Sequence, residues 1–285
     1  MATEERILRD NPGDLMTPPN LFEEHAGHFW GILDTRTYMR ARYALVEALL
    51  EIETYTAVNA AHDHIMDLLR LSRSDNMGVR DLVPALKLRL GKDQECYDFC
   101  VWYATTGEED DYDWADLDLP FLDVKNADVF EPVPKNILQK YGGALSHTVG
   151  LTLLKIKLLL SVQALRNASM LAEKVPQEIL DAICLQLVRS TLIADHENII
   201  NSSDKTGLIQ KLQGQIKILY RAVDAQNKHF WPALLKPGKH LTAQPDAYSP
   251  GSVQHMQIVL MYNYAAWAET QGAIDVIRVL VQRKI

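Results

Sequence analysis

The residues that could ligate a metal ion fall into two clusters. Glu23–His25 and His28 place acidic and imidazole groups within one or two helical turns, and Asp195–Glu197 is a second such group. A dimetal centre in a helical bundle needs Glu and Glu-x-x-His motifs paired on facing helices, and the chain lacks that pairing. His62 and His64 would point to different faces of one helix. We therefore expect no metal site here, and surface or core histidines are the alternative interpretation.

Sequence motifs for catalysis are also absent. There is no Gly-x-x-x-x-Gly-Lys-Ser/Thr phosphate loop, no Gly-x-Ser-x-Gly elbow and no His-Glu-x-x-His pair. The run Asp110–Asp118 has oxygen ligands at alternate positions, which suits calcium, but it lacks the order of an EF-hand loop. We expect a solvated acidic loop there. The sequence thus predicts a protein that is not an enzyme and has no cofactor.

The charge of the chain is unevenly distributed. The 285 residues carry a formal net charge of −8, yet residues 93–131 hold thirteen acidic residues and one lysine, a net charge of −12. The rest of the chain is therefore at +4. Because this segment would repel a phosphate backbone and no basic stripe compensates for it, we expect no nucleic-acid partner.

Neither a membrane span nor a targeting segment is evident. The most apolar run, Val149–Leu165, is at the short limit for a span and carries Lys155 and Lys157 near its middle. The three cysteines are Cys96, Cys100 and Cys184, and no two of them form a Cys-x-x-Cys pair. A reducing compartment is then the default. We expect a cytoplasmic protein without membrane contact, whose apolar run is a buried helix.

The apolar periodicity is helical along most of the chain, and nothing resembles a long strand, so the expected fold class is all-α. We expect Pro84 to kink the third helix, because it removes a backbone hydrogen bond inside it. The expected helices lie at about 35–52, 58–71, 79–90, 93–104, 146–165, 176–200, 205–225, 252–269 and 271–282.

The first four helices suggest a repeated pair. Leu45-Val46-x-Ala48-Leu49 recurs 37 residues later as Leu82-Val83-x-Ala85-Leu86, and Ala61 corresponds to Cys96 at a shift of 35. A period of about 34–37 residues with two helices per unit is typical of a tetratricopeptide-type array. A helical hairpin duplicated by chance is the alternative.

Several stretches resemble a tetratricopeptide-like family, and the resemblance is closest to fungal members, some of which carry a zinc-binding MYND finger. In that family a motif of the type ETRPYMRAR opens one helix, and a DNQG motif followed by Val or Ile and Arg opens the helix one repeat later. The matching stretches here are His28-Phe29-Trp30-Gly31, Thr35-Arg36-x-Tyr38-Met39-Arg40-Ala41-Arg42-Tyr43, Asp75-Asn76-Met77-Gly78-Val79-Arg80-Asp81-Leu82, Asn227-x-His229-Phe230-Trp231-Pro232-x-Leu234-Leu235, Tyr248-x-x-Gly251-Ser252 and Ala266-Trp267-x-x-Thr270-x-Gly272-Ala273.

The resemblance brackets residues 28–276 and implies a helical-repeat scaffold that binds proteins, with no established chemistry. The MYND finger itself is absent, because three scattered cysteines cannot supply its ligands. The expected organisation is an N-terminal extension (1–34), tetratricopeptide-like helix pairs (35–104), an acidic, aromatic-rich loop insert (105–145) and a C-terminal helical region packed on the repeats (146–285).

Stacked helical hairpins form a concave groove lined by the first helix of each repeat. Arg80 and Lys87 are seven residues apart and would share a face, where either could bind a partner carboxylate; pairing with Glu47, Glu51 or Asp81 on the helix surface is the alternative. We therefore expect an adaptor that binds an acidic or C-terminal peptide, with self-association left open. A helical enzyme, or a small-molecule or metal-binding protein with a pocket between the repeats and the C-terminal helices, is the second hypothesis. The expected peptide-binding residues are Arg40, Arg42, Asn76, Arg80 and Lys87.

Overall fold

The computed structural model describes residues 1–171 other than Leu15, residues 190–283 other than Asp195 and Ser203, and positions 176, 178, 179 and 182 in between. These described residues form helices and no strand, which confirms the all-α class. The α-helices are α1 (Ala2–Arg9), α2 (Leu21–Glu24), α3 (Thr35–Leu50), α4 (Tyr55–Leu71), α5 (Val83–Arg89), α6 (Asp93–Ala104), α7 (Leu145–Leu171), α9 (Thr191–Ala194), α10 (Glu197–Asn201), α11 (Thr206–Gln226), α12 (Phe230–Leu235), α13 (Val253–Glu269) and α14 (Ala273–Gln282).

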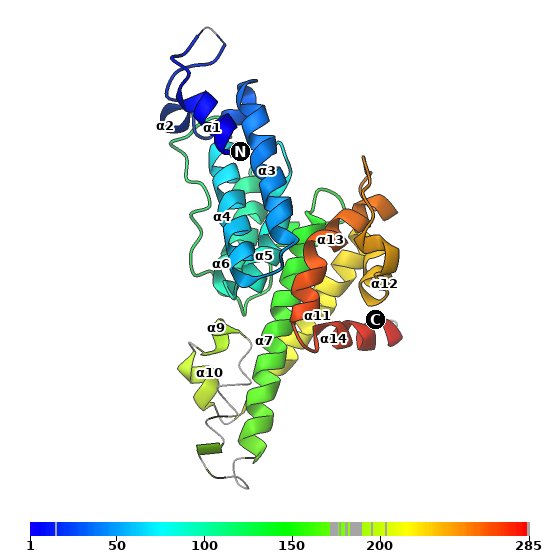
Figure 1. The fold of residues 1–285 in the computed structure, drawn as a ribbon. Helices are drawn as coiled ribbons and strands as arrows, with labels where there is room; N and C mark the ends of the chain where they lie inside the picture. The colour runs from blue at the N-terminus through cyan, green and yellow to red at the C-terminus, as the bar shows by residue number, and fades with distance from the viewer. Residues whose placement is uncertain are drawn as a thin grey trace.

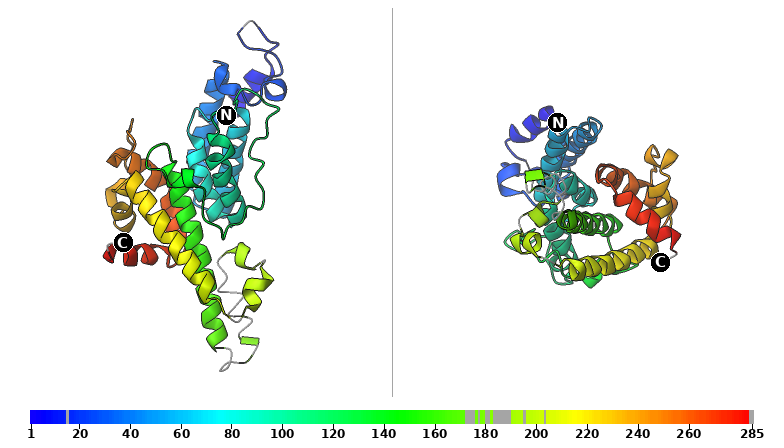
Figure 2. Two further views of the ribbon diagram at one scale, coloured as in Figure 1. Left: turned by 180° about the vertical axis from the view of Figure 1, so that it is seen from behind. Right: turned by 90° about the horizontal axis from the view of Figure 1, so that it is seen from below.

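Short 3₁₀ helices complete the described fold. They are η1 (Phe29–Gly31), η2 (Val79–Leu82), η3 (Thr106–Glu108), η4 (Lys135–Leu138) and η5 (Gly238–Leu241). Helices α3–α6 form one group, and α11–α14 form another on the opposite side of the long helix α7 (Figures 1 and 2). The central position of α7 explains why its sequence is apolar on all sides.

Helices α3 and α4 are an antiparallel pair, and α5 and α6 continue the same group (Figure 1). The hydroxyl of Thr54 accepts a hydrogen bond from the backbone N–H of Ala57 and so caps α4. The kink expected at Pro84 is wrong. The segment 79–90 is divided into η2 and α5, and Pro84 falls in the first turn of α5, where no intrahelical N–H is needed.

The two sequence segments that suggest a repeat lie in different environments. Val46 and Val83 are both buried, but Ala48 is exposed whereas Ala85 is buried. Helix α5 is covered on all sides, since every residue from Val83 to Leu88 is buried. The tetratricopeptide-like arrangement stays a prediction.

Helix α7 is the one described helix that is long and apolar enough to cross a membrane, from Leu145 to Ala168, judged by length and composition alone. Inside this protein 83% of its most apolar window is buried. Gly150 lets α7 approach α5 closely, because a Cβ at this position would lie 2.6 Å from the Cβ of Pro84. Packing within the fold therefore accounts for its apolar surface.

Two lysines of α7 are buried in this core with polar partners. Lys155 donates hydrogen bonds to the carbonyl oxygens of Val129 and Glu131, and burial lowers its pKa to about 7. Lys157 Nζ lies 2.6 Å from Asp93 Oδ1, and the other oxygen of Asp93 accepts a hydrogen bond of 2.7 Å from the hydroxyl of Ser190. Both lysines thus join α7 to distant segments.

Residues 105–144 contain only the short helices η3 and η4, and their aromatic side chains pack against α6. The ring of Trp102 contacts Tyr112, Trp114 and Phe121 at centroid distances of 5.5, 5.9 and 5.2 Å. Its indole N–H donates to Asp123 Oδ1 at 3.0 Å. The acidic segment is therefore anchored on the helical core.

The C-terminal group also has an aromatic centre. Trp231 stacks on Tyr220 and lies 5.7 Å from Trp267, which joins α12 to α11 and α13. The expected continuous helix from 176 to 200 is wrong where the structure describes it, because α9 ends at Ala194 and α10 starts at Glu197 after a non-helical His196. Residues 177, 180, 181, 183–189 and 195 of that prediction, which include Cys184, lie outside the described residues.

Candidate functional site

The arginines predicted on α3 contact other residues of their own helical group. Arg42 donates hydrogen bonds to the hydroxyl of Tyr38, to Asp67 and to His64, and its side chain is only 12% exposed. Arg40 is exposed, and its guanidinium lies 5.6 Å from the centre of the Trp30 ring. Arg42 is therefore used inside the fold, whereas Arg40 remains at the surface.

Asn76 and Lys87 also have partners within the protein. The side-chain oxygen of Asn76 accepts hydrogen bonds from the hydroxyls of Ser72 and Ser74. Lys87 is buried, and its ammonium lies 2.7 Å from Glu95. The acidic partner of Lys87 is therefore Glu95 and none of the three residues expected from the sequence, which are Glu47, Glu51 and Asp81.

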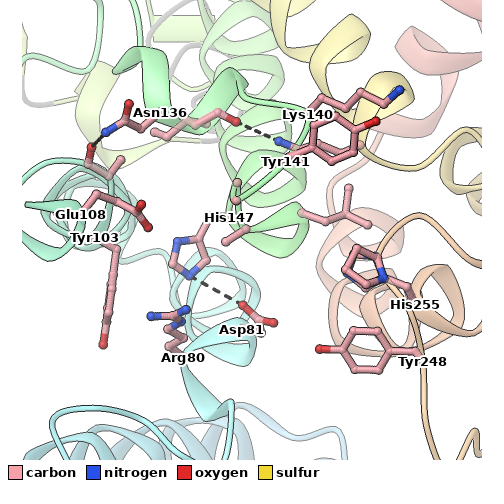
Figure 3. Close-up of a pocket in the computed structure, with 18 residues that line it drawn as sticks. Arg80, Asp81, Tyr103, Glu108, Asn136, Lys140, Tyr141, His147, Tyr248 and His255 are labelled. Carbon is pink, nitrogen blue, oxygen red and sulfur yellow. Dashed lines mark hydrogen bonds and ion pairs between the residues drawn. The ribbon is translucent and has the colours of Figure 1, made fainter. Parts of the chain in front are cut away.

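Two of the five predicted residues line cavities: Asn76 lines one of about 310 Å³ beside Trp30 and Trp114, and Arg80 lines one of about 400 Å³. The cavity beside Arg80 has more charged side chains in its lining. The cavity lies between η2, the end of α6, the start of α7, the end of α11 and the segment before α13 (Figure 3). Its walls therefore come from both helical groups. Charged, polar and aromatic side chains line the cavity, among them Arg80, Asp81, Tyr103, Glu108, Lys140, Tyr141, His147, Gln226, Tyr248 and His255.

The turn before η2 places Arg80 in the cavity wall. Asp75 and Gly78 adopt positive φ angles of 49° and 69°, and the carboxylate of Asp75 accepts the backbone N–H groups of Val79 and Arg80 at 2.9 and 3.0 Å. The guanidinium of Arg80 lies over the Tyr103 ring at 5.1 Å and 3.9 Å from Asp75. Its side chain keeps 39% exposure. This arrangement holds a cation ready for an incoming anion.

Asp81 and His147 lie next to each other in the cavity lining, with Oδ1 of Asp81 4.0 Å from Nε2 of His147 (Figure 3). Burial raises the pKa of Asp81 to about 6 and lowers the pKa of His147 to about 3. The rings of Phe99 and Tyr103, each 5.6 Å from the imidazole, supply the apolar surroundings. At neutral pH the pair is therefore a carboxylate beside a neutral imidazole.

Three buried polar atoms of residues in the cavity lining have no hydrogen-bond partner among the described residues. They are the hydroxyl of Tyr103, Nε2 of His147 and Oε1 of Gln226. All three side chains are more than nine-tenths buried. These atoms have almost no accessible surface, so they lie behind the cavity lining and not in its open space.

The rim of the cavity is aromatic and accessible. Tyr141 is 77% exposed and Tyr248 is 51% exposed, an unusual degree for large rings. Tyr248 stacks on His255 at 5.0 Å, and Lys140 Nζ lies 5.1 Å from the centre of the Tyr141 ring. The rim thus offers two rings and a cation near the entrance.

Most of this site was missed from the sequence. Of the five predicted binding residues only Arg80 lines the cavity, and Asp81 was considered only as a surface partner of Arg80 or Lys87. Gln226, Lys140 and Tyr141 belong to no recognised motif, so no local signal identified them. Among the described residues no group of three or more His, Cys, Asp or Glu side chains could hold a metal ion; Asp195 of the predicted cluster lies outside them.

No family model, curated protein or solved structure matches this chain. The resemblance to tetratricopeptide-like proteins with MYND-linked members accordingly remains a prediction from the motifs.

Proposed function

We propose that this chain is a non-enzymatic helical scaffold that binds a partner protein by the carboxyl end of the partner's chain, in the cavity beside Arg80. The observation that carries the proposal is a partly exposed guanidinium in the wall of a cavity of about 400 Å³. A guanidinium recognises a carboxylate by two parallel hydrogen bonds. The planar group of Arg80, supported by the Tyr103 ring, suits that geometry.

The rim supports a peptide ligand. Tyrosine and arginine dominate the residues whose truncation weakens protein interfaces, and here two exposed tyrosines flank the entrance. A cavity of about 400 Å³ takes the last residue of a peptide, while the preceding residues would contact Tyr141 and Tyr248. The net charge of −12 in the acidic segment 93–131 would repel a phosphate backbone, which argues against a nucleic-acid partner.

A small-molecule acid is the second candidate. The observation that favours it is the cavity volume of about 400 Å³ beside Arg80, which is enough for a small acid. Such a ligand would use Arg80 in the same way but would not need Tyr141 or Tyr248. Native mass spectrometry of the protein from its own cells tests this candidate, because a retained acid of fixed mass would favour it.

The test of the peptide hypothesis is selection from a library of peptides with randomised, free carboxyl-terminal residues. We expect enriched peptides to lose binding when the terminal carboxylate is amidated. Arg80→Gln should weaken binding about 10- to 150-fold, since hydrogen bonds to a charged group contribute about 1.5–3 kcal/mol. Arg278→Gln is the matched control, because Arg278 is a half-exposed arginine paired only with Asp275 on α14.

Enrichment that is insensitive to amidation, or equal binding by the two arginine variants, would overturn the proposal. Circular dichroism of each variant checks that the helical fold is kept.

A further inference from the structure

A second cavity, with a volume of about 310 Å³, lies where three segments of the chain meet. Its lining residues come from the segment 27–36 at the start of α3, from the turn 72–76 after α4, and from Trp114 and Ala115 of the acidic segment. It shares no lining residue with the cavity beside Arg80. A binding site here is therefore independent of the proposed function.

Backbone and side-chain contacts hold the three segments together. The backbone N–H of Gly27 donates to the carbonyl oxygen of Leu71 at 2.9 Å, and the backbone N–H of Arg73 donates to the carbonyl oxygen of Gly27 at 3.1 Å. Nη1 of Arg73 also donates to the carbonyl oxygen of Leu119 at 3.1 Å. A Cβ on Gly27 would lie 2.3 Å from a methyl group of Leu117, so the acidic segment packs closely on this residue. The walls are consequently in place before any ligand enters.

Arg36 gives this cavity a cation that is held by neutral groups only. Its Nε donates to the carbonyl oxygen of Trp30 at 2.9 Å, and its guanidinium lies 5.1 Å from the centre of the Trp30 ring. No carboxylate among the described residues pairs with it. Because only Nε is used, the N–H groups of Nη1 and Nη2 remain, and this end of a guanidinium binds a carboxylate by two parallel hydrogen bonds. Arg40 adds a second guanidinium 5.6 Å from the same ring.

The rest of the lining adds a donor and no negative charge. The side-chain oxygen of Asn76 accepts from the hydroxyls of Ser72 and Ser74, and its amide nitrogen has no partner among the described residues. None of the described residues that line this cavity is Asp or Glu. The nearby carboxylates of Asp113 and Asp116 accept backbone N–H groups within the acidic segment, at 2.8 and 2.9 Å. The lining therefore favours an anion.

We infer that this cavity binds a small aromatic carboxylic acid, whose carboxylate pairs with Arg36. Trp30 and Trp114 both line the cavity and are both partly exposed, so a ligand ring can contact two indole groups. Pairs of aromatic rings are favourable beyond the burial of their area. The volume of about 310 Å³ is at the small end of the usual range for ligand sites, about 300–1,000 Å³, which suits a ligand of one or two rings.

The experiment titrates nitrogen-15-labelled protein with three related probes and follows the indole N–H signals by NMR. The probes are 2-naphthylacetate, 2-naphthylacetamide, which removes only the charge, and decahydro-2-naphthylacetate, which removes the aromatic rings. We expect 2-naphthylacetate to shift the signals of Trp30 and Trp114, assigned with Trp30→Phe and Trp114→Phe, and to leave the signal of the buried Trp267 unchanged. The amide should bind about 10- to 150-fold more weakly, on the scale of charge-assisted hydrogen bonds, and the saturated acid about 2- to 10-fold more weakly.

Two variants locate the binding site. Arg36→Gln should weaken binding of 2-naphthylacetate about 10- to 150-fold and remove most of its preference over the amide. Arg278→Gln on α14, at an exposed arginine, is the matched control and should change neither. Because Arg36 also contacts Trp30, the second variant leaves that contact intact: Asn76→Asp, at an exposed residue, keeps the acceptor oxygen and adds a negative charge. It should weaken binding of the acid several-fold and that of the amide much less. Circular dichroism checks the fold of each variant.

The possible outcomes are distinct. Equal binding of the acid and the amide, or of the acid and its saturated analogue, overturns the assignment of an aromatic acid. Binding that is lost in Arg80→Gln and kept in Arg36→Gln places the probe in the cavity beside Arg80 and overturns the assignment as well. Unchanged Trp30 and Trp114 signals at millimolar 2-naphthylacetate overturn the site itself, whereas the proposed function is decided separately by the peptide selection.

Discussion

Replacing Lys157 by methionine tests the buried ion pair that joins α7 to α6. Lys157 Nζ donates to Asp93 Oδ1 at 2.6 Å and lies 3.4 Å from the carbonyl oxygen of Leu88. The carboxylate of Asp93 has no exposed surface, and its only other side-chain partner in the described structure is the hydroxyl of Ser190. Lys157→Met keeps the length of the side chain and removes the charge, so Asp93 would be left buried without a counter-charge.

The expected loss in the free energy of unfolding is about 3–5 kcal/mol, the usual cost of removing one partner from a buried pair. The methionine stem replaces the lysine stem, so little apolar burial changes. In the double variant Lys157→Met/Asp93→Leu the uncompensated charge is gone. The hydroxyl of Ser190 then loses its carboxylate partner, while the carbonyl oxygen of Leu88 keeps the backbone N–H of Gly91, so the stability should lie within about 1–3 kcal/mol of wild type.

The assay is urea unfolding followed by far-ultraviolet circular dichroism, with the slope compared among variants to check that the same surface is exposed. Arg278→Met breaks an exposed ion pair and should change stability by about 0.5 kcal/mol or less. A loss below about 1 kcal/mol for Lys157→Met would refute the reasoning. A double variant no more stable than the single one would refute it too, because the cost would then not come from the stranded carboxylate.

Gly150→Ala should lower the free energy of unfolding by about 1–3 kcal/mol, since its Cβ would lie 2.6 Å from Pro84; an unchanged urea midpoint would contradict the close packing of α7 on α5. Because burial lowers the pKa of Lys155 to about 7, the unfolded chain holds this proton up to pH 10.5 and the folded chain does not. Between pH 7 and 10.5 the free energy of unfolding of wild type should therefore rise with pH relative to that of Lys155→Met, by at most about 1.4 kcal/mol per pH unit. Denaturant titrations that give parallel pH profiles for the two proteins would contradict this shift in the pKa of Lys155. Asp75→Ala should lower the free energy of unfolding by about 1–2 kcal/mol, because two hydrogen bonds from backbone N–H groups are lost. Asp75→Asn should lower it less, because asparagine tolerates the positive φ and keeps an acceptor. Equal melting temperatures of the two variants would contradict the capping role of Asp75. Burial raises the pKa of Asp81 from 3.8 to about 6, so between these values the folded chain holds a proton that the unfolded chain has lost. The free energy of unfolding should therefore fall as the pH rises from 3.8 to about 6 in wild type relative to Asp81→Asn, and parallel profiles of the two in denaturant titrations would contradict this.

Helical periodicity predicted most of the fold because it depends on side chains that repeat along one element. Ile65, Leu68 and Leu69 recur at helical spacing and are buried in the structure. The same method placed a kink at Pro84, because it extended one helix over a segment in which a 3₁₀ turn precedes α5. Where an element ends depends on the turn chemistry of Asp75 and Gly78, which periodicity does not register.

The site was predicted only at Arg80, for a related reason. The spacing argument placed Lys87 on the same outward face, but α5 is buried all round and has no outward face, so Lys87 pairs with Glu95 instead. The cavity lining combines His147 from the start of α7 with Gln226 from the end of α11. Such residues meet only through tertiary packing, so no stretch of sequence contains their arrangement.

The anchoring of the acidic segment on Trp102 has a consequence for encounters in solution. The charge of −12 is held at one place on the molecule by aromatic packing and by backbone hydrogen bonds to Asp98, and the rest of the chain is at +4. The protein consequently carries a permanent electric dipole. In dilute salt this dipole turns an approaching charged partner before contact, and at about 0.1 M salt the torque fades within about 10 Å. The acidic segment thus biases the orientation in which partners arrive at the molecule.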